Sequence, residues 1–271
     1  MSERVAVRGI GDLPTVGPAA LCMGVFDGVH RGHLALVAAT VAAARERGVA
    51  SVALVFDPHP DEVVRPGTMV PRLAPLGENL RRLARAGIDH AFAVRFDPAL
   101  RSLDPDAFLA ATARSLALRA LVMTPESAFG RNRAGTPDAM RELGARSGFD
   151  LVLAERVEDA GTPISSARVR AALGAGDLAT VLRLLGHPLY LEAELLGADG
   201  GLHALRFDYL PALPGPGGYP AAVRPLSEDG PGRDGAVPAR LVVSADGVQL
   251  GGDEVAGGGR VAVELPGAGE A

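Results

Sequence analysis

Short uninterrupted apolar runs alternate along the first half of the chain with longer segments in which apolar residues recur every three or four positions. Runs of the first kind predict buried strands, and the second pattern predicts amphipathic helices. The predicted strands are residues 19–26, 51–56, 88–94, 118–123 and 149–154. The predicted helices are residues 31–47, 76–87, 104–116 and 137–147. The alternation predicts an α/β fold, a Rossmann-like doubly wound parallel sheet with helices on both faces.

Ligands of such a sheet bind beyond the carboxyl ends of its strands. The loops to examine therefore follow Phe26, Phe56, Met123 and Ala154. The candidate motifs described below fall in these loops.

The pattern changes after residue 186, where Gly and Pro become frequent, as between Pro211 and Pro220. Short apolar runs still predict strands at residues 189–196, 241–243 and 261–263. We therefore predict two domains, residues 1–186 and a smaller β-rich domain at residues 187–271. A partly disordered tail is the alternative. A pair of helices is predicted after Ile164, ending near Leu185, and is expected to pack on the parallel sheet.

The amino-acid composition excludes several classes of protein function. All 27 basic residues of the 271 are Arg, and the absence of Lys excludes a Walker-type phosphate loop, a Schiff-base lysine and pyridoxal chemistry. A net charge of −5 gives no reason to expect nucleic acid or an anionic membrane as a partner. The single cysteine, Cys22, excludes an intramolecular disulfide. No apolar run approaches the roughly 20 residues that span a bilayer and no secretory signal is evident, so a cytoplasmic location is expected.

The most specific motif is the segment GVFDGVHRGH at residues 24–33, where a predicted strand turns into a helix. Gly24 and Gly28 let a ligand approach the backbone, and the N–H groups at the helix start suit phosphates. His30 and His33 can stabilise charge on a transferring phosphoryl group without a lysine. Two alternatives are a zinc pair, for which further ligands are not evident, and histidines that cap the helix.

This segment resembles the G-x-F-D-G-x-H-x-G-H signature of bacterial FAD synthetases, the amino-terminal module of bifunctional riboflavin kinase/FAD synthetases. Further similar motifs follow in the family's order, so that the resemblance covers about residues 18–190. They are VFDPHP at residues 55–60, FGR at 129–131, ISSARVR at 164–170 and LGHP at 185–188. The resemblance implies a nucleotidyltransferase-type sheet in the first domain and a riboflavin-kinase-like second domain.

The activity that the resemblance implies is FMN adenylyltransferase, an enzyme that makes FAD and pyrophosphate from FMN and ATP, with Mg²⁺ entering on the nucleotide. The implied catalytic residues are His30, His33 and Arg170. The implied nucleotide-binding residues are Gly24, Phe26, Asp27, Gly28, Ser165, Ser166 and Arg168. The implied flavin-binding residues are His59, Pro60, Glu126, Phe129 and Arg131. No metal-ligating side chain and no oligomeric state are implied.

Purely structural alternatives exist for two of these motifs. Ser165 stands before an amphipathic run and can be an ordinary helix cap, followed by solvated arginines. His59 lies between two prolines and can be a simple turn residue.

The chain departs from the family pattern at several places. The segment TPESA at residues 124–128 puts Glu126 where the family has an amide or a shorter acid, and lacks the neighbouring aromatic. Ala167 replaces a Thr, and the family's Glu-Lys pair in the third helix appears as Glu78-Asn79. These departures keep two alternatives open. One is an adenylyl- or cytidylyltransferase for another phosphorylated small molecule, and the other is a regulatory nucleotide- or flavin-binding protein with a decayed site.

The kinase-like part departs further. In place of the family's G-x-P-T-A-N segment, whose Thr and Asn hold the metal and the nucleotide, the chain reads LRFDY at residues 205–209. No helix that could carry a catalytic Glu is evident after it. We therefore expect a degenerate domain without riboflavin kinase activity.

Overall fold

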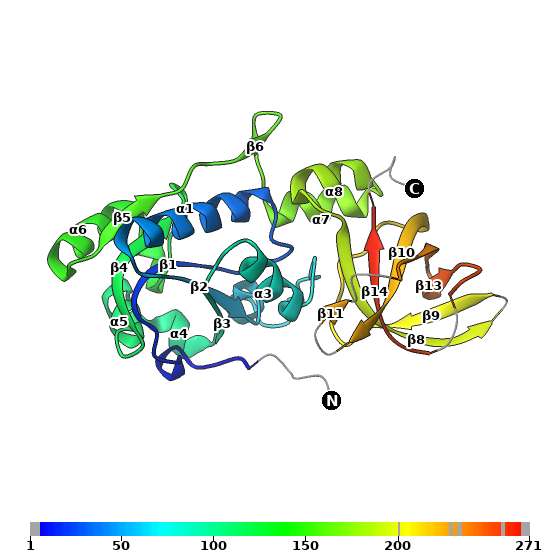
Figure 1. Cartoon of the computed structure of the whole chain (residues 1–271), viewed down its shortest axis with the longest axis horizontal. Helices are drawn as coiled ribbons and strands as arrows, with labels where there is room; N and C mark the ends of the chain where they lie inside the picture. Colours follow the sequence, from blue (N-terminus) through cyan, green and yellow to red (C-terminus); the bar gives the residue numbers. More distant parts are fainter. Residues whose placement is uncertain (1–5, 200, 228–229, 232–234, 256–257, 267–271) are drawn as a thin grey trace. The chain divides into compact units, whose positions relative to one another are not determined.

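The computed structural model describes residues 6–199, 201–227, 230–231, 235–255 and 258–266. The chain folds into two compact units (Figure 1). The sheet unit comprises the described residues up to Val70 together with Asn79–Pro163. The barrel unit comprises Pro71–Glu78 and the described residues from Ile164 onward.

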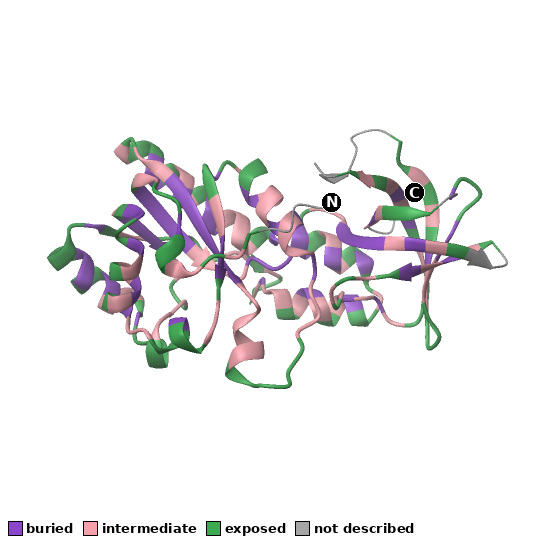
Figure 2. Ribbon diagram, turned by 90° about the horizontal axis from the view of Figure 1, so that it is seen from below, coloured by how far each residue is buried: buried purple, intermediate pink, exposed green. Residues whose placement is uncertain are grey.

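Five parallel strands form the sheet unit, in the order β3-β2-β1-β4-β5 that is typical of a Rossmann-like sheet. They are β1 (Gly17–Gly24), β2 (Ala50–Asp57), β3 (His90–Arg95), β4 (Leu116–Met123) and β5 (Asp150–Leu153). β1 is central, and its residues from Ala19 to Cys22 are fully buried because strands flank both edges and side chains cover both faces. Figure 2 shows the buried residues concentrated in these strands.

Helices connect the successive strands. They are α1 (Arg31–Arg47), α2 (Pro60–Val64), α3 (Leu76–Arg85), α4 (Pro98–Ser102), α5 (Pro105–Thr112) and α6 (Pro137–Ser147), with 3₁₀ turns η1 (Ile10–Asp12) and η2 (Arg131–Arg133). α1 packs on β1, β2, β4 and β5, and Figure 1 shows α1 and α5 on opposite sides of the sheet. The predicted Rossmann-like parallel sheet with flanking helices is confirmed. Within the described residues, no helix is long and apolar enough to cross a membrane.

The helix predicted at residues 104–116 is shorter in the structure. The Asp104 carboxylate caps its start by accepting a 2.8 Å hydrogen bond from the Ala107 N–H, and the helix ends at Thr112. The Ser115 hydroxyl then donates to the Leu13 carbonyl at 2.6 Å. Leu116 already belongs to β4, because the apolar run that begins there pairs with β1.

The barrel unit contains α7 (Ser166–Gly174), α8 (Leu178–Leu185) and a closed antiparallel barrel of six strands. The strands are β8 (Leu189–Asp199), β9 (Leu202–Arg206), β10 (Gly217–Ser227), β12 (Val237–Ser244), β13 (Gly247–Gly251) and β14 (Gly259–Leu265). The barrel closes because β10 pairs with both β12 and β14. Three short strands complete the topology: β11 (Gly230–Pro231) pairs with β10, and β6 (Glu158–Asp159) pairs with β7 (Thr162–Pro163) in the sheet unit. The predicted β-rich C-terminal part is confirmed, in the form of a barrel.

The helix pair α7 and α8 belongs with the barrel, whereas the sequence predicts that it packs on the parallel sheet. α7 packs on α8, and α8 packs on β8. The buried residues of α8 recur at helical spacing, as Leu178, Val181 and Leu185. That pattern identifies a covered face without saying which element covers it, so the sequence could not choose between sheet and barrel. The domain boundary at residues 186 and 187 stays a prediction.

Cys22 offers a test of how tightly β1 is enclosed. Burial raises the pKa of the Cys22 thiol to about 12. Because the thiolate is the reactive form, we expect the folded protein to resist thiol reagents at neutral pH. The measurement is the rate of labelling by a disulfide reagent in buffer and in concentrated guanidinium chloride. Equal rates in the two conditions would contradict the buried position of β1.

Candidate functional site

The candidate site begins where β1 ends. β1 lies between β2 and β4, so the chain leaves the sheet in opposite directions on its two sides, and ligands of such sheets bind at this switch point. The loop after β1 runs directly into α1, whose first residue is Arg31. This is the segment that carries both histidines of the motif.

The loop is a tight turn with an unusual backbone. The Val29 N–H donates to the Phe26 carbonyl at 3.1 Å, and Gly28 has φ +76° at the third position of the turn. Phe26 at φ +52° and Val29 at φ +41° also lie in the left-handed region. A non-glycine residue there costs on the order of 1–3 kcal/mol and persists only where surrounding contacts hold it. Phe26, Asp27 and Val29 are all buried, so the turn is held by packing.

His30 caps α1. Its Nδ1 accepts a 3.2 Å hydrogen bond from the His33 N–H, as the helix-capping alternative expects. The two imidazole rings are stacked, with centroids 3.6 Å apart and planes 13° from parallel. Because Nδ1 is the acceptor, the proton of a neutral His30 sits on Nε2. The cap therefore leaves His30 with a donor atom on the other side of its ring.

His33 lies between the ring of His30 and the ring of Phe26, whose centroid is 5.1 Å away. Its Nδ1 is buried and has no hydrogen-bond partner in the described part of the chain. Burial, with a smaller contribution from the charge of His30, holds the pKa of His33 well below its usual 6.5. His33 is therefore a neutral imidazole at physiological pH.

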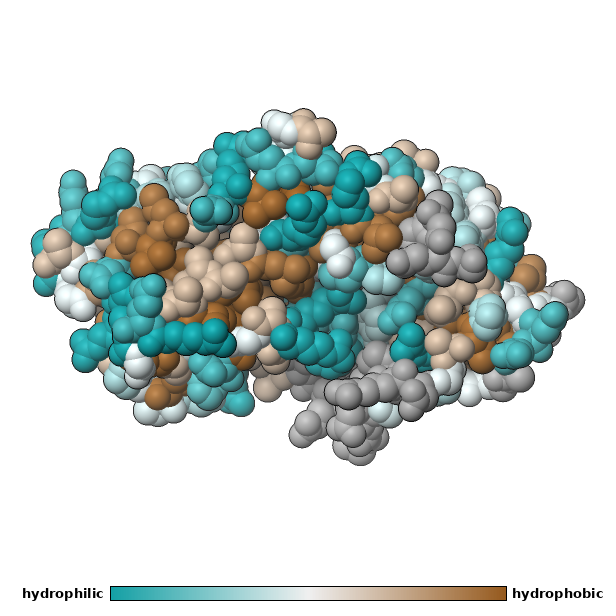
Figure 3. Space-filling model, turned by 45° about the horizontal axis from the view of Figure 1, so that its top comes forward, coloured by the Kyte–Doolittle hydropathy of each residue, from teal (hydrophilic) through white to brown (hydrophobic). Residues whose placement is uncertain are grey.

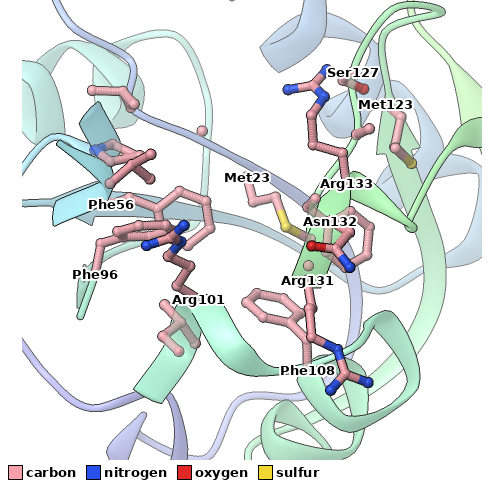
Figure 4. Close-up of a pocket in the computed structure, with 18 of the residues that line it drawn as sticks. Met23, Phe56, Phe96, Arg101, Phe108, Met123, Ser127, Arg131, Asn132 and Arg133 are labelled. Atoms are coloured by element: carbon pink, nitrogen blue, oxygen red, sulfur yellow. The ribbon is translucent and has the colours of Figure 1, made fainter. Parts of the chain in front are cut away.

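A cavity of about 870 Å³ adjoins this loop at the carboxyl end of the sheet (Figure 4). It is lined at one point by Met23, Gly24 and Val25, the residues that lead from β1 into the loop. Its other walls come from β2, β4, α2, α4, α5 and the segment from Thr124 to Arg133. Figure 3 shows apolar side chains reaching the surface of the sheet unit between hydrophilic ones.

Four phenylalanines form a continuous wall of the cavity. Phe56 packs against Phe96 and Phe108 with centroids 5.5 and 6.4 Å apart, and Phe108 packs against Phe129 at 5.2 Å. All three contacts are edge-to-face, the arrangement that aromatic rings prefer. Such a wall suits a flat aromatic ligand.

The charged side chains at the cavity are mainly basic. Arg101, Arg131 and Arg133 line it, against one carboxylate, Asp61. Arg131 forms a loose 3.9 Å ion pair with Asp104. The Arg101 guanidinium forms no hydrogen bond or ion pair with any residue that the structure describes. Figure 4 shows Phe56, Phe96 and Arg101 on one side of the pocket, and Asn132 and Arg133 on the other. The cavity thus combines an apolar wall with cations.

The implied binding residues of the sheet unit that lie outside the turn from Phe26 to Val29 fall into two groups. Gly24, Pro60, Phe129 and Arg131 line the cavity. His59 and Glu126 are not among its lining residues. The His59 Nδ1 accepts a 3.1 Å hydrogen bond from the Asp61 N–H and caps α2, while Glu126 forms a 2.7 Å ion pair with Arg156 on the surface.

The remaining implied residues, Ser165, Ser166, Arg168 and Arg170, belong to the barrel unit. The Ser165 hydroxyl accepts a 3.3 Å hydrogen bond from the Arg168 N–H and caps α7. The Arg170 Nε donates to the Pro71 carbonyl at 2.7 Å, which ties α7 to the segment at residues 71–78 of the same unit. Ser165 is thus a helix cap, as its structural alternative expects. The contact of these residues with a nucleotide stays a prediction.

Sequence reasoning missed Phe96 and Arg101. Both follow β3, the edge strand, and the loop after this strand was not among those singled out for ligands. The rule that ligands bind beyond strand ends applies equally to β3, so the signal was present. Phe108 was missed for another reason, because a phenylalanine at helical spacing is typical of a core residue.

A Rossmann-like α/β fold with paired histidines at the helix that follows its central strand defines the class of this protein. A family model described as FAD synthetase matches residues 14–168, more than half of the chain. The chain therefore belongs to the FAD synthetase family.

Named relatives agree with this assignment. The bifunctional riboflavin kinase/FMN adenylyltransferase of Escherichia coli (strain K12) is 34% identical over 197 residues, which cover 71% of this chain and 63% of the relative. The protein of the same name from Pseudomonas fluorescens is 35% identical over 192 residues, or 70% of this chain and 61% of the relative. The matches thus span less than two thirds of these relatives. A crystal structure titled as a macrolide-efflux protein from Streptococcus pneumoniae superposes with a TM-score of 0.84, covering 98% of this chain and 90% of that one. At 21% identity it supports the fold alone.

The lowered pKa of His33 predicts how stability depends on pH. The unfolded chain binds a proton at this residue below its usual pKa of 6.5, whereas the folded chain does not. Stability is therefore expected to fall as the pH drops below 6.5, by up to about 1.4 kcal/mol per pH unit from this residue. His33→Gln removes the titrating group. The measurement is the urea unfolding free energy of both proteins at several pH values, and parallel curves would contradict the prediction.

Proposed function

We propose that this protein is an FMN adenylyltransferase, which transfers AMP from ATP to FMN and releases FAD and pyrophosphate. The observation that carries the proposal is the continuity of the aromatic-walled cavity with the histidine loop, because Gly24 and Val25 belong to the cavity and lead directly into the turn. A flavin in the cavity would have its phosphate within reach of a nucleotide bound at the start of α1. Membership of the FAD synthetase family supports the same acceptor.

The proposed reaction requires no covalent intermediate with the protein. A phosphate oxygen of FMN attacks the α-phosphorus of ATP, and the bond from that phosphorus to the bridging oxygen of the β-phosphate breaks. Pyrophosphate leaves with both electrons of the broken bond. The protein then contributes alignment of the two substrates and stabilisation of the charge that develops on the phosphate oxygens.

We assign the stabilisation of this charge to His30 and His33. The cap fixes the orientation of the His30 ring and places the proton of its neutral form on Nε2. His33, which is neutral at physiological pH, packs against the His30 ring and can donate a hydrogen bond without adding a positive charge. The proposal also assigns phosphate contacts to Ser165, Ser166, Arg168 and Arg170, whose guanidinium groups suit phosphate oxygens.

Magnesium is expected to arrive with the nucleotide. Among the described residues, no three His, Cys, Asp or Glu side chains gather into a group that could hold a metal ion. Mg²⁺ commonly binds through substrate phosphates and keeps several waters, so a protein cage is not required. When bound, the ion would neutralise charge on the leaving pyrophosphate.

The decisive test is product analysis by chromatography after incubation with ATP, Mg²⁺ and FMN. FAD and pyrophosphate are expected in equal amounts, with loss of about a hundredfold or more in rate for His33→Ala because one donor to the transition state is removed. Other phosphorylated acceptors and CTP serve as competitors in parallel reactions. Calorimetric binding of ATP without any binding of FMN would contradict the proposal and favour a different acceptor.

Arg101 provides a prediction for the acceptor. Since its guanidinium has no partner within the described residues, a flavin carbonyl or phosphate oxygen can take that place. We expect Arg101→Ala to weaken FMN binding about tenfold, the worth of one hydrogen bond to a charged group. Quenching of FMN fluorescence measures this without catalysis. Arg141→Ala, which removes an arginine from the exposed face of α6, is the matched control, and an equal effect of both substitutions would contradict the role of Arg101.

We further propose that the barrel does not phosphorylate riboflavin. The Thr and Asn of the family's kinase segment are absent from residues 205–209. Two aromatic residues of this segment have structural contacts instead: Phe207 packs edge-on against Tyr209 at 6.1 Å, and the Glu192 N–H donates to the Tyr209 hydroxyl at 3.3 Å.

Riboflavin with ATP and Mg²⁺ is accordingly expected to give no FMN. The measurement is chromatographic detection of FMN against a blank without protein. The FAD-forming reaction of the same preparation shows that the protein is intact. FMN production above the blank would contradict the proposal and show that other residues of the barrel hold the metal and the nucleotide.

A further inference from the structure

Asn79 reaches the loop after β1 from a helix 51 positions further along the chain. Its Oδ1 accepts a 3.0 Å hydrogen bond from the Gly28 N–H. The bond is buried, and only 4% of Asn79 is exposed. A hydrogen bond of this kind joins α3 to the one peptide group at the centre of the turn.

The position of this bond matters because of the backbone around it. Gly28 and Val29 are consecutive residues with positive φ, and a β-branched valine rarely adopts such a conformation. Residues in such a strained conformation keep it only where several surrounding contacts hold it in place. By accepting from the Gly28 N–H, Asn79 fixes the orientation of the peptide between Asp27 and Gly28, at the centre of the turn that leads into Val29. The residue after Val29 is His30, the cap of α1.

We infer that Asn79 is a positioning residue, which holds the turn so that His30 and His33 present their rings to the phosphates. The inference deepens the proposed function and rests on it for the identity of the ligand. It also redefines the role of Gly28, whose N–H is bound by Asn79 and is not offered to a nucleotide. The phosphate donors are then the histidines and the N–H groups of the first turn of α1.

Three substitutions in the full-length protein test the role. Asn79→Leu keeps the size of the side chain and removes the acceptor, while Asn79→Asp keeps an acceptor at the same place. Thr40→Val is the matched control, because Thr40 is fully buried in the same unit and donates a 2.7 Å hydrogen bond to the Leu36 carbonyl, away from the loop. The readouts are kcat for FAD formation, FMN binding by fluorescence, and hydrogen exchange of the Gly28 and His33 amides.

For Asn79→Leu we expect kcat to fall about tenfold or more through misplacement of the histidines, with FMN binding changed less than about twofold. The Gly28 and His33 amides should exchange faster. Asn79→Asp should restore both kcat and amide protection, and Thr40→Val should leave both near the values of the unsubstituted protein.

Unchanged kcat and amide protection in Asn79→Leu would overturn the inference. A loss of kcat and amide protection in Asn79→Asp as large as in Asn79→Leu would also overturn it, and so would an equal loss in Thr40→Val. Either result would indicate a general effect of changing a buried polar group. If the unsubstituted protein makes no FAD, the proposed function fails by itself. The exchange of the Gly28 and His33 amides then still decides whether Asn79 holds the turn.

Discussion

The turn from Phe26 to Val29 is the constraint on which the sheet unit depends. The chain must leave the central strand β1 and enter α1 within six residues, and it does so through three residues with positive φ. Burial of Phe26 and Val29, the cap of His30 on α1 and the hydrogen bond from Gly28 to Asn79 together hold this shape. A relaxed turn would move both imidazoles, because His30 and His33 follow it without an intervening loop.

The cavity beside the turn follows from the same strand order. β1 is flanked by β2 and β4, so the loops that leave these strands diverge above it and open a space at their carboxyl ends. Aromatic residues from several elements fill the wall of that space, and arginines stand at its polar side. A flavin phosphate has both features, a flat apolar ring system and an anionic group. In the proposed function, the cavity and the turn are two parts of one reaction centre.

Local patterns predicted much of this architecture. The limits of α1 and α6 could be predicted to the residue, because His30 and Thr136 cap their starts and a left-handed Gly48 or Gly148 follows their ends. The cavity wall could not be predicted, because Phe96 and Phe108 become neighbours of Phe56 only when β3 and α5 take their places. The bond from Gly28 to Asn79 was equally hidden, since no local pattern joins residues so distant in sequence. The grouping of α8 with the barrel was missed because its apolar face does not identify its partner.

The most direct test of the central claim, that the cavity and the histidine turn form one reaction centre, is a crystal structure of the full chain with FMN and a non-hydrolysable ATP analogue. The claim predicts the isoalloxazine ring against Phe56 and Phe129, its phosphate directed toward Gly24, and the nucleotide phosphates beside His30 and His33. A flavin bound outside the cavity, or nucleotide phosphates remote from both histidines, would contradict it.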